Sequence, residues 1–122
     1  MKQKKSVEDY LKIIYTLSKR RAVHGSDIAG ELGVSRPTVS VALKALAEEG
    51  YVFVDDIHEV HLTEKGKRIA EDTYERHSMF CRLLTGLGVD AKPASADACE
   101  MEHAVSPQSY EALKRLTDTG EI

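Results

Sequence analysis

Apolar side chains recur at spacings of three and four residues through the first fifty positions, the pattern of amphipathic helices. Ser26 and Ser35 are suited to cap the second and third of these helices, and Gly33 suits a left-handed stop after the second. Pro37 falls in the first turn of the third helix, where its missing N–H costs nothing. The pattern therefore predicts helices over residues 6 to about 19, 26–33 and 35–50.

Two β-rich runs follow, Y-V-F-V at residues 51–54 and E-V-H-L-T at residues 59–63, separated by D-D-I-H. Two helices joined through a glycine and followed by such a hairpin are typical of a winged helix-turn-helix, which we expect over residues 1–70. The third helix would then enter the DNA major groove. A plain solvated helix is the alternative for its outer face. The predicted DNA contacts are Ser35, Arg36, Pro37, Thr38, Ser40, Val41 and Lys44.

Three more helices are predicted in residues 71–122: a long apolar one to about Gly86, one from about Pro93 to Val105, and a last one that Ser106 and Pro107 start. The long helix is too apolar for the surface of a monomer, which indicates a homodimer. The expected fold class is thus mainly α, with a winged helix-turn-helix DNA-binding domain followed by a helical metal-binding and dimerisation domain.

Charge and composition narrow the function. The chain has 122 residues, 42% apolar, and a net charge of -3, and its size argues against a large enzyme fold. Residues 1–70 hold 12 Lys and Arg against 10 Asp and Glu, whereas residues 71–122 hold 5 against 10. The basic excess of the first part gives weak support for nucleic acid. No apolar run approaches the roughly 20 residues of a membrane span, and a cytoplasmic protein is expected.

The stretch D-A-C-E-M-E-H, residues 97–103, gathers side chains that can bind metals. On a helix, Cys99, Glu102 and His103 point into one arc of roughly 100°. Further ligands must come from elsewhere, and His77 on the long helix, with Cys81 four residues on, is the natural source. Taken singly, each of these residues is more often a buried thiol, a hydrogen-bonded histidine or a solvated acid. Together they predict a metal site.

Five motifs carry a family resemblance across essentially the whole chain. They are E-D-Y-L-K-I-I-Y (8–15), S-R-P-T-V-S (35–40), L-T-E-K-G (62–66), R-H (76–77) and D-A-C-E-M-E-H (97–103). In these the chain resembles the diphtheria toxin repressor and manganese transport regulator family, in the branch that lacks an SH3-like domain. The resemblance implies a homodimeric winged-helix repressor that binds a palindromic operator on double-stranded DNA when loaded with Fe(II) or Mn(II).

The resemblance also implies metal ligands position by position, and the set is a hybrid. Asp9 resembles the manganese branch and would tie the first helix to the ion, although it could equally cap that helix. Cys99 resembles the iron branch, and a thiolate shifts preference towards Fe(II), Co(II) or Zn(II). Lys12 stands where the manganese branch has a second acid, and an ammonium cannot ligate. The implied ligands are Asp9, His77, Cys99, Glu102 and His103, with Cys81 either a ligand or buried.

Two other function classes are alternatives to this one. A thiol-based regulator would use Cys81 and Cys99 without metal, and oxidation would then release its DNA. A small zinc enzyme would need a cluster such as H-E-x-x-H, which the order of residues 97–103 does not provide. We therefore expect no enzyme activity, no small-molecule substrate and no membrane partner.

Overall fold

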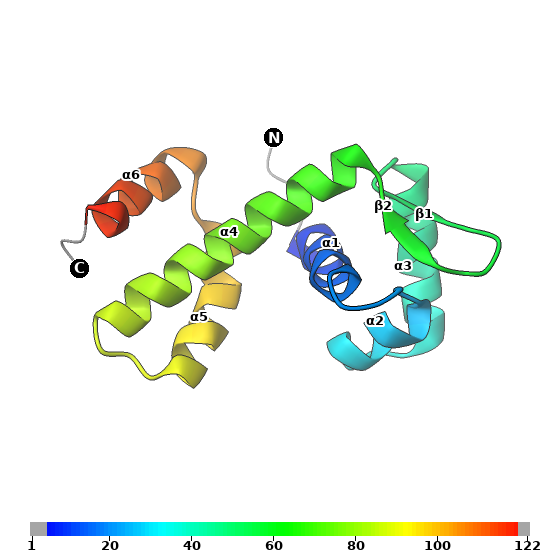
Figure 1. The fold of residues 1–122 in the computed structure, drawn as a ribbon, viewed down its shortest axis with the longest axis horizontal. Coiled ribbons are helices and arrows are strands. Elements are labelled where there is room, and N and C mark those ends of the chain that lie inside the picture. The colour runs from blue at the N-terminus through cyan, green and yellow to red at the C-terminus, as the bar shows by residue number, and fades with distance from the viewer. Residues whose placement is uncertain (1–4, 120–122) are drawn as a thin grey trace. The chain divides into compact units, whose positions relative to one another are not determined.

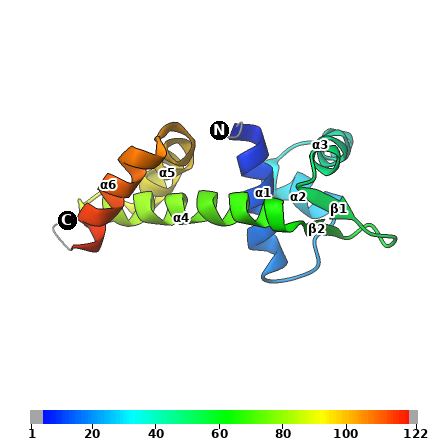
Figure 2. The same cartoon turned by 90° about the horizontal axis from the view of Figure 1, so that it is seen from above.

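The computed structural model describes residues 5–119, and the chain divides into two compact units, residues 1–71 and 72–122 (Figure 1). The long helix α4, Glu64–Gly86, contributes its start to the first unit and the rest to the second. It runs as one continuous helix in the view of Figure 2.

The first unit holds three helices, α1 (Lys5–Ser18), α2 (Gly25–Leu32) and α3 (Arg36–Glu48). The hydroxyl of Ser35 accepts a hydrogen bond from the Thr38 amide at 3.2 Å, and so caps α3 as predicted. Gly33 takes the left-handed conformation, φ 68°, that ends α2. The helix-turn-helix expected from the sequence is confirmed.

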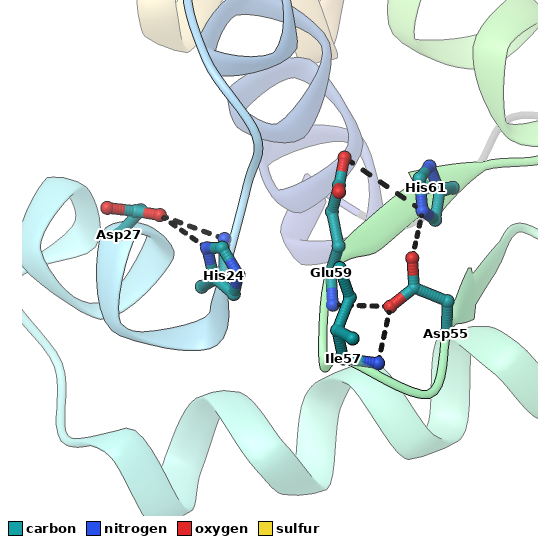
Figure 3. A network of polar contacts seen from close by, with 6 residues as sticks. All are labelled: His24, Asp27, Asp55, Ile57, Glu59 and His61. Atoms are coloured by element: carbon teal, nitrogen blue, oxygen red, sulfur yellow. Dashed lines mark hydrogen bonds and ion pairs between the residues drawn. The ribbon is translucent and has the colours of Figure 1, made fainter.

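The predicted start of α2 was wrong. The cap is His24 and not Ser26, because the carboxylate of Asp27 reaches back and accepts a hydrogen bond from the His24 amide at 2.9 Å (Figure 3). An acid three residues after the cap satisfies this amide from within the first turn. The helix therefore begins at Gly25.

The core of the first unit lies between its helices and the following hairpin. Side chains spaced at three and four residues along α1 and α3 meet those of the strands, as the apolar pattern predicts. The buried residues are Leu11, Ile14, Leu17, Val23, Ile28, Ala29, Val39, Leu43, Leu46, Tyr51, Val52, Val60 and Ala70.

The predicted wing is a two-stranded antiparallel sheet of β1 (Val52–Val54) and β2 (Val60–Leu62). One carboxylate, Asp55, organises the loop between the strands (Figure 3). Its Oδ1 accepts hydrogen bonds from the amides of Ile57 and Glu59 at 3.0 and 2.9 Å, while Oδ2 lies 2.8 Å from His61 Nε2. The hydrogen bond with His61, and then those from the loop amides, lower the pKa of Asp55.

The start of α4 packs directly on the backbone of the wing. Thr63 donates its amide to the carbonyl of Tyr51 at 3.0 Å, and its hydroxyl accepts from the Gly66 amide at 3.1 Å. A Cβ atom on Gly66 would lie 2.0 Å from the Tyr51 carbonyl oxygen. The glycine of the L-T-E-K-G motif is therefore required for this close approach.

The second unit contains the rest of α4, with α5 (Ala91–Ala104) and α6 (Pro107–Asp118). Ser106 caps α6 as predicted, but α5 starts two residues before Pro93, which lies within its first turn. Arg76 links the helices, because its Nη1 donates to the Val105 carbonyl at 2.7 Å and its guanidinium lies 4.8 Å from the ring centre of Tyr110. The core residues are Met79, Phe80, Leu83, Ala98 and Tyr110.

The architecture is mainly helical, as expected, with a winged helix-turn-helix first and a helical unit after it. Within residues 5–119, no helix combines the length and the apolar character needed to span a bilayer.

Candidate metal centre and DNA-binding surface

Three of the predicted ligands come together in the second unit. His77 projects from α4, and Cys99 and Glu102 project from α5, one turn apart. One donor atom from each lies within 4.8 Å of the others. His77 Nδ1 is 3.1 Å from Glu102 Oε2 and 3.7 Å from Cys99 Sγ. Imidazole, carboxylate and thiol therefore face one common point between two helices.

These spacings fit a bound ion. Nitrogen and oxygen ligands at about 2.1 Å, with sulfur at about 2.3 Å, put neighbouring donors about 3.0–3.4 Å apart, or about 3.1–3.6 Å when one is sulfur. The two distances from His77 Nδ1 lie close to these values. The contact between Nδ1 and Oε2 is also not a well-directed hydrogen bond, although the two atoms are close. The donor set suits a divalent cation of the first transition series.

Glu102 is the acid of this group, and it is buried, at 1% exposure. Its Oε1 lies 3.2 Å from Nε2 of His103, which is buried too, so its two oxygens face two different imidazoles. A carboxylate taken out of water is costly unless positive charge or hydrogen bonds compensate it. The two imidazoles face this carboxylate, and a cation at the common point would add positive charge beside it.

Cys81 lies on the other side of the same imidazole. Its Sγ is 3.5 Å from His77 Nε2, whereas Cys99 approaches Nδ1. Cys81 is not part of the group formed by His77, Cys99 and Glu102. Both thiols are outside any disulfide and partly buried.

Asp9, the remaining predicted ligand, lies half-buried on α1 in the first unit. Lys12 is on the same helix and is also half-buried. The role of Asp9 as a ligand stays a prediction.

The sequence reasoning missed a second group of donors in the wing. Oxygens of Asp55 and Glu59 lie 2.8 and 4.0 Å from His61 Nε2 (Figure 3). The alternation in D-D-I-H-E-V-H could have indicated it, because residues 59 and 61 share one face of a strand. Asp55 already uses this contact to hold the loop, which accounts for the cluster without a ligand.

The predicted DNA contacts lie on or next to the exposed face of α3. Ser35 is engaged at the cap, where its hydroxyl also lies 2.8 Å from that of Thr38. Val41 is 72% exposed, an unusual place for an apolar side chain on a helix. Arg36, Ser40 and Lys44 line a cleft of about 590 Å³ whose other wall includes Val54, His58 and Val60 of the wing.

Two family models match this chain, one in each half. Residues 3–58 match the family described as iron dependent repressor, N-terminal DNA binding domain. Residues 63–121 match iron dependent repressor, metal binding and dimerisation domain.

Individual relatives agree with this match. The transcriptional regulator MntR of Escherichia coli O6:H1 is 36% identical over 112 residues, which cover 91% of this chain and 72% of the relative. An HTH-type transcriptional regulator of Methanocaldococcus jannaschii is also 36% identical, over 89% of this chain and 90% of the relative. The solved structure of the manganese regulator SloR superimposes with a TM-score of 0.80 at 35% identity, over 97% of this chain. The chain spans about half of SloR, 55% of its length. With both halves matched and these relatives in agreement, the chain belongs to the iron-dependent repressor family of transcriptional regulators.

Proposed function

We propose that this protein is a transcriptional repressor whose affinity for operator DNA depends on a divalent ion bound by His77, Cys99 and Glu102. The single observation that carries the proposal is the buried carboxylate of Glu102, which shares a common point with an imidazole and a thiol from two helices. An ion held there would place positive charge beside this buried carboxylate.

His103 and Asp9 complete the proposed ligand set. His103 is supported by its contact with the second oxygen of Glu102, 3.2 Å away. Asp9 is proposed from the sequence motif alone, as the residue through which ion binding is communicated to the DNA-binding unit. Because Lys12 carries an ammonium where a further acid would be needed, we propose one tightly bound ion per subunit.

Cys81 is proposed to orient His77 and not to bind the ion. Its Sγ contacts Nε2, the ring nitrogen that faces away from Cys99. A partner on the far nitrogen fixes the orientation and the tautomer of a metal-binding histidine.

The proposed ion is Fe(II) or Mn(II). SloR is described as a manganese regulator, which favours Mn(II) by analogy. The thiol of Cys99 favours Fe(II), because sulfur ligands raise affinity for the later, softer metals more than for Mn(II). We propose that both ions activate and that Fe(II) binds more tightly.

On the DNA side, we propose a homodimer that reads a palindromic operator with half-sites about one helical turn apart. Leu87 and Leu116 of the second unit are 63% and 38% exposed, and we propose that a second subunit covers these apolar side chains. The proposed DNA contacts are Ser35, Arg36, Pro37, Thr38, Ser40, Val41 and Lys44.

The experiment selects a binding duplex from a random pool under anaerobic conditions with Mn(II) present, and then challenges the complex in two ways. Chelator should release the DNA, whereas a thiol oxidant added to the loaded protein without chelator should release it less. Release by oxidant alone, with chelator ineffective, would instead support regulation by the two thiols.

A further inference from the structure

Arg76 directly precedes His77 on α4, and it is buried, at 8% exposure. A guanidinium stays charged in proteins, so its burial is costly unless hydrogen bonds or nearby groups compensate it. Its Nη1 donates to the Val105 carbonyl at 2.7 Å, and its guanidinium lies 4.8 Å from the ring centre of Tyr110. The carboxylate of Asp72, 3.3 Å from Nε, is 59% exposed and therefore screened by water. The short, charge-assisted bond to Val105 is thus the strongest of these contacts.

Val105 caps the C-terminal end of α5, just after the turn that carries Glu102 and His103. Carbonyls at the end of a helix have no partner within it, and a cation there is also favoured by the helix dipole. Arg76 meets both needs. Because the accepting oxygen belongs to the backbone, this hydrogen bond fixes the helix itself. The contact between His77 and Glu102, by contrast, joins two side chains that can each rotate.

Two consecutive residues of α4 therefore reach the last turn of α5 in different ways. His77 faces the carboxylate of Glu102 at 3.1 Å, and Arg76 holds the backbone three residues further on. Without the second contact, α5 could turn or slide against α4, which would change the distances between the donor atoms. Ligands held in place before an ion arrives lower the cost of binding it.

We propose that Arg76 is a positioning residue of the ion site, which sets the place of Glu102 and His103 relative to His77 before the ion binds. This deepens the proposed function and rests on it. Arg76 itself does not bind the ion, because a guanidinium offers no acceptor atom. It acts through the backbone of Val105.

The first test uses the full-length protein without any ion. Arg76→Met keeps a long unbranched side chain but cannot donate to the Val105 carbonyl. Amide hydrogen exchange in a peptide spanning residues 99–105 should become about tenfold faster, the effect of deleting a hydrogen bond to a charged group. Arg76→Lys keeps the charge but not the planar fork that donates to Val105 and lies over Tyr110, so it should show the same change to a smaller extent.

The second test titrates Mn(II) and Co(II) into the same proteins under anaerobic conditions. Arg76→Met should bind Mn(II) about 10- to 100-fold more weakly, the range for residues that orient a ligand. Its visible Co(II) absorption should shift, because the ligands surround the ion differently. Arg76→Lys should lie between Arg76→Met and the parent in both measurements.

Leu113→Ala is the matched control. Leu113 packs against the core of the second unit from α6, so its truncation destabilises this unit while Arg76 and Val105 stay unchanged. It should lower the urea midpoint and leave the Mn(II) affinity and the Co(II) spectrum as in the parent.

The outcomes separate the two proposals. Exchange, Mn(II) affinity and Co(II) spectrum that match the parent in Arg76→Met would overturn the positioning role, while the proposed function would stand. Equal changes in Arg76→Met and Leu113→Ala would overturn it too, because Arg76 would then only stabilise the fold. If Arg76→Met does not fold, a match between Arg76→Lys and the parent in all three measurements would overturn the role. A parent that binds neither Mn(II) nor Co(II) would overturn both proposals.

Discussion

Oε2 of Glu102 lies 3.1 Å from Nδ1 of His77, and the two side chains come from different helices of the second unit. Cys99 approaches the same ring nitrogen at 3.7 Å. The helix spacing places Cys99 beside Glu102, since the two are three residues apart on α5. The packing of α4 against α5 then brings His77 to both of them. Any change that removes the carboxylate charge should therefore affect ion binding before it affects the fold.

Glu102→Gln keeps the shape of the side chain and removes its charge. We expect affinity for Mn(II) to fall at least about 100-fold, beyond the usual effect of losing a residue that only supports a ligand. Glu100→Gln, on the exposed side of the same helix, should change it little. Anaerobic calorimetric titration measures both. Equal affinity in Glu102→Gln and the parent would remove this residue from the ligands.

The two thiols should behave differently towards Co(II). A coordinated thiolate gives a sulfur-to-cobalt charge-transfer absorption, which Cys99→Ser should abolish. Cys81→Ser should retain that absorption, with weaker Co(II) binding, because its thiol contacts the far nitrogen of His77. Ultraviolet absorption during Co(II) titration distinguishes the variants. Loss of the band in Cys81→Ser alone would exchange the two roles.

Two glycines should respond in opposite ways to alanine. Gly66→Ala places a Cβ against the Tyr51 carbonyl, which is backbone and cannot turn aside, so we expect a loss of at least about 3 kcal/mol in the free energy of unfolding. Gly30 lies in α2 with open space where its Cβ would be, and Gly30→Ala should stabilise by about 0.4–1 kcal/mol. Urea denaturation provides both values. A neutral Gly66→Ala would show that the start of α4 does not depend on this close packing.

The wing should lose stability in acid. Because the hydrogen bond from His61 and those from the loop amides lower the pKa of Asp55, its contribution is complete above the unfolded pKa, about 3.9, and is lost as the pH falls through the lower folded value. Asp55→Asn should thus destabilise the protein at neutral pH, and its difference from the parent should shrink below about pH 4. Thermal unfolding at a series of pH values tests this. A difference that stays constant into strong acid would contradict it.

The sequence was enough to predict the helix-turn-helix, since apolar spacing and the caps Gly33 and Ser35 are local signals. It was not enough to place the start of α2, because the sequence analysis took Ser26 as the cap and did not consider the hydrogen bond between the Asp27 carboxylate and the His24 amide. Element boundaries depend on such small differences in hydrogen bonding.

The candidate site divides in the same way. Cys99, Glu102 and His103 follow from periodicity on one helix, and His77 from its motif. Which ring nitrogen each thiol approaches depends on side-chain rotation and helix packing, which no spacing encodes. The direction in which the Asp55 carboxylate points could not be predicted either, because it depends on how this side chain folds back onto the amides of its own loop.

The most direct test of ion-dependent repression is the affinity of one selected duplex for the protein, measured by fluorescence anisotropy with Mn(II) and again with chelator. A coupling of ordinary size predicts about 5- to 150-fold tighter binding with Mn(II) for the parent, and no such gain for Glu102→Gln. Equal affinity of the parent with and without the ion, repeated with Fe(II), would contradict ion-dependent repression.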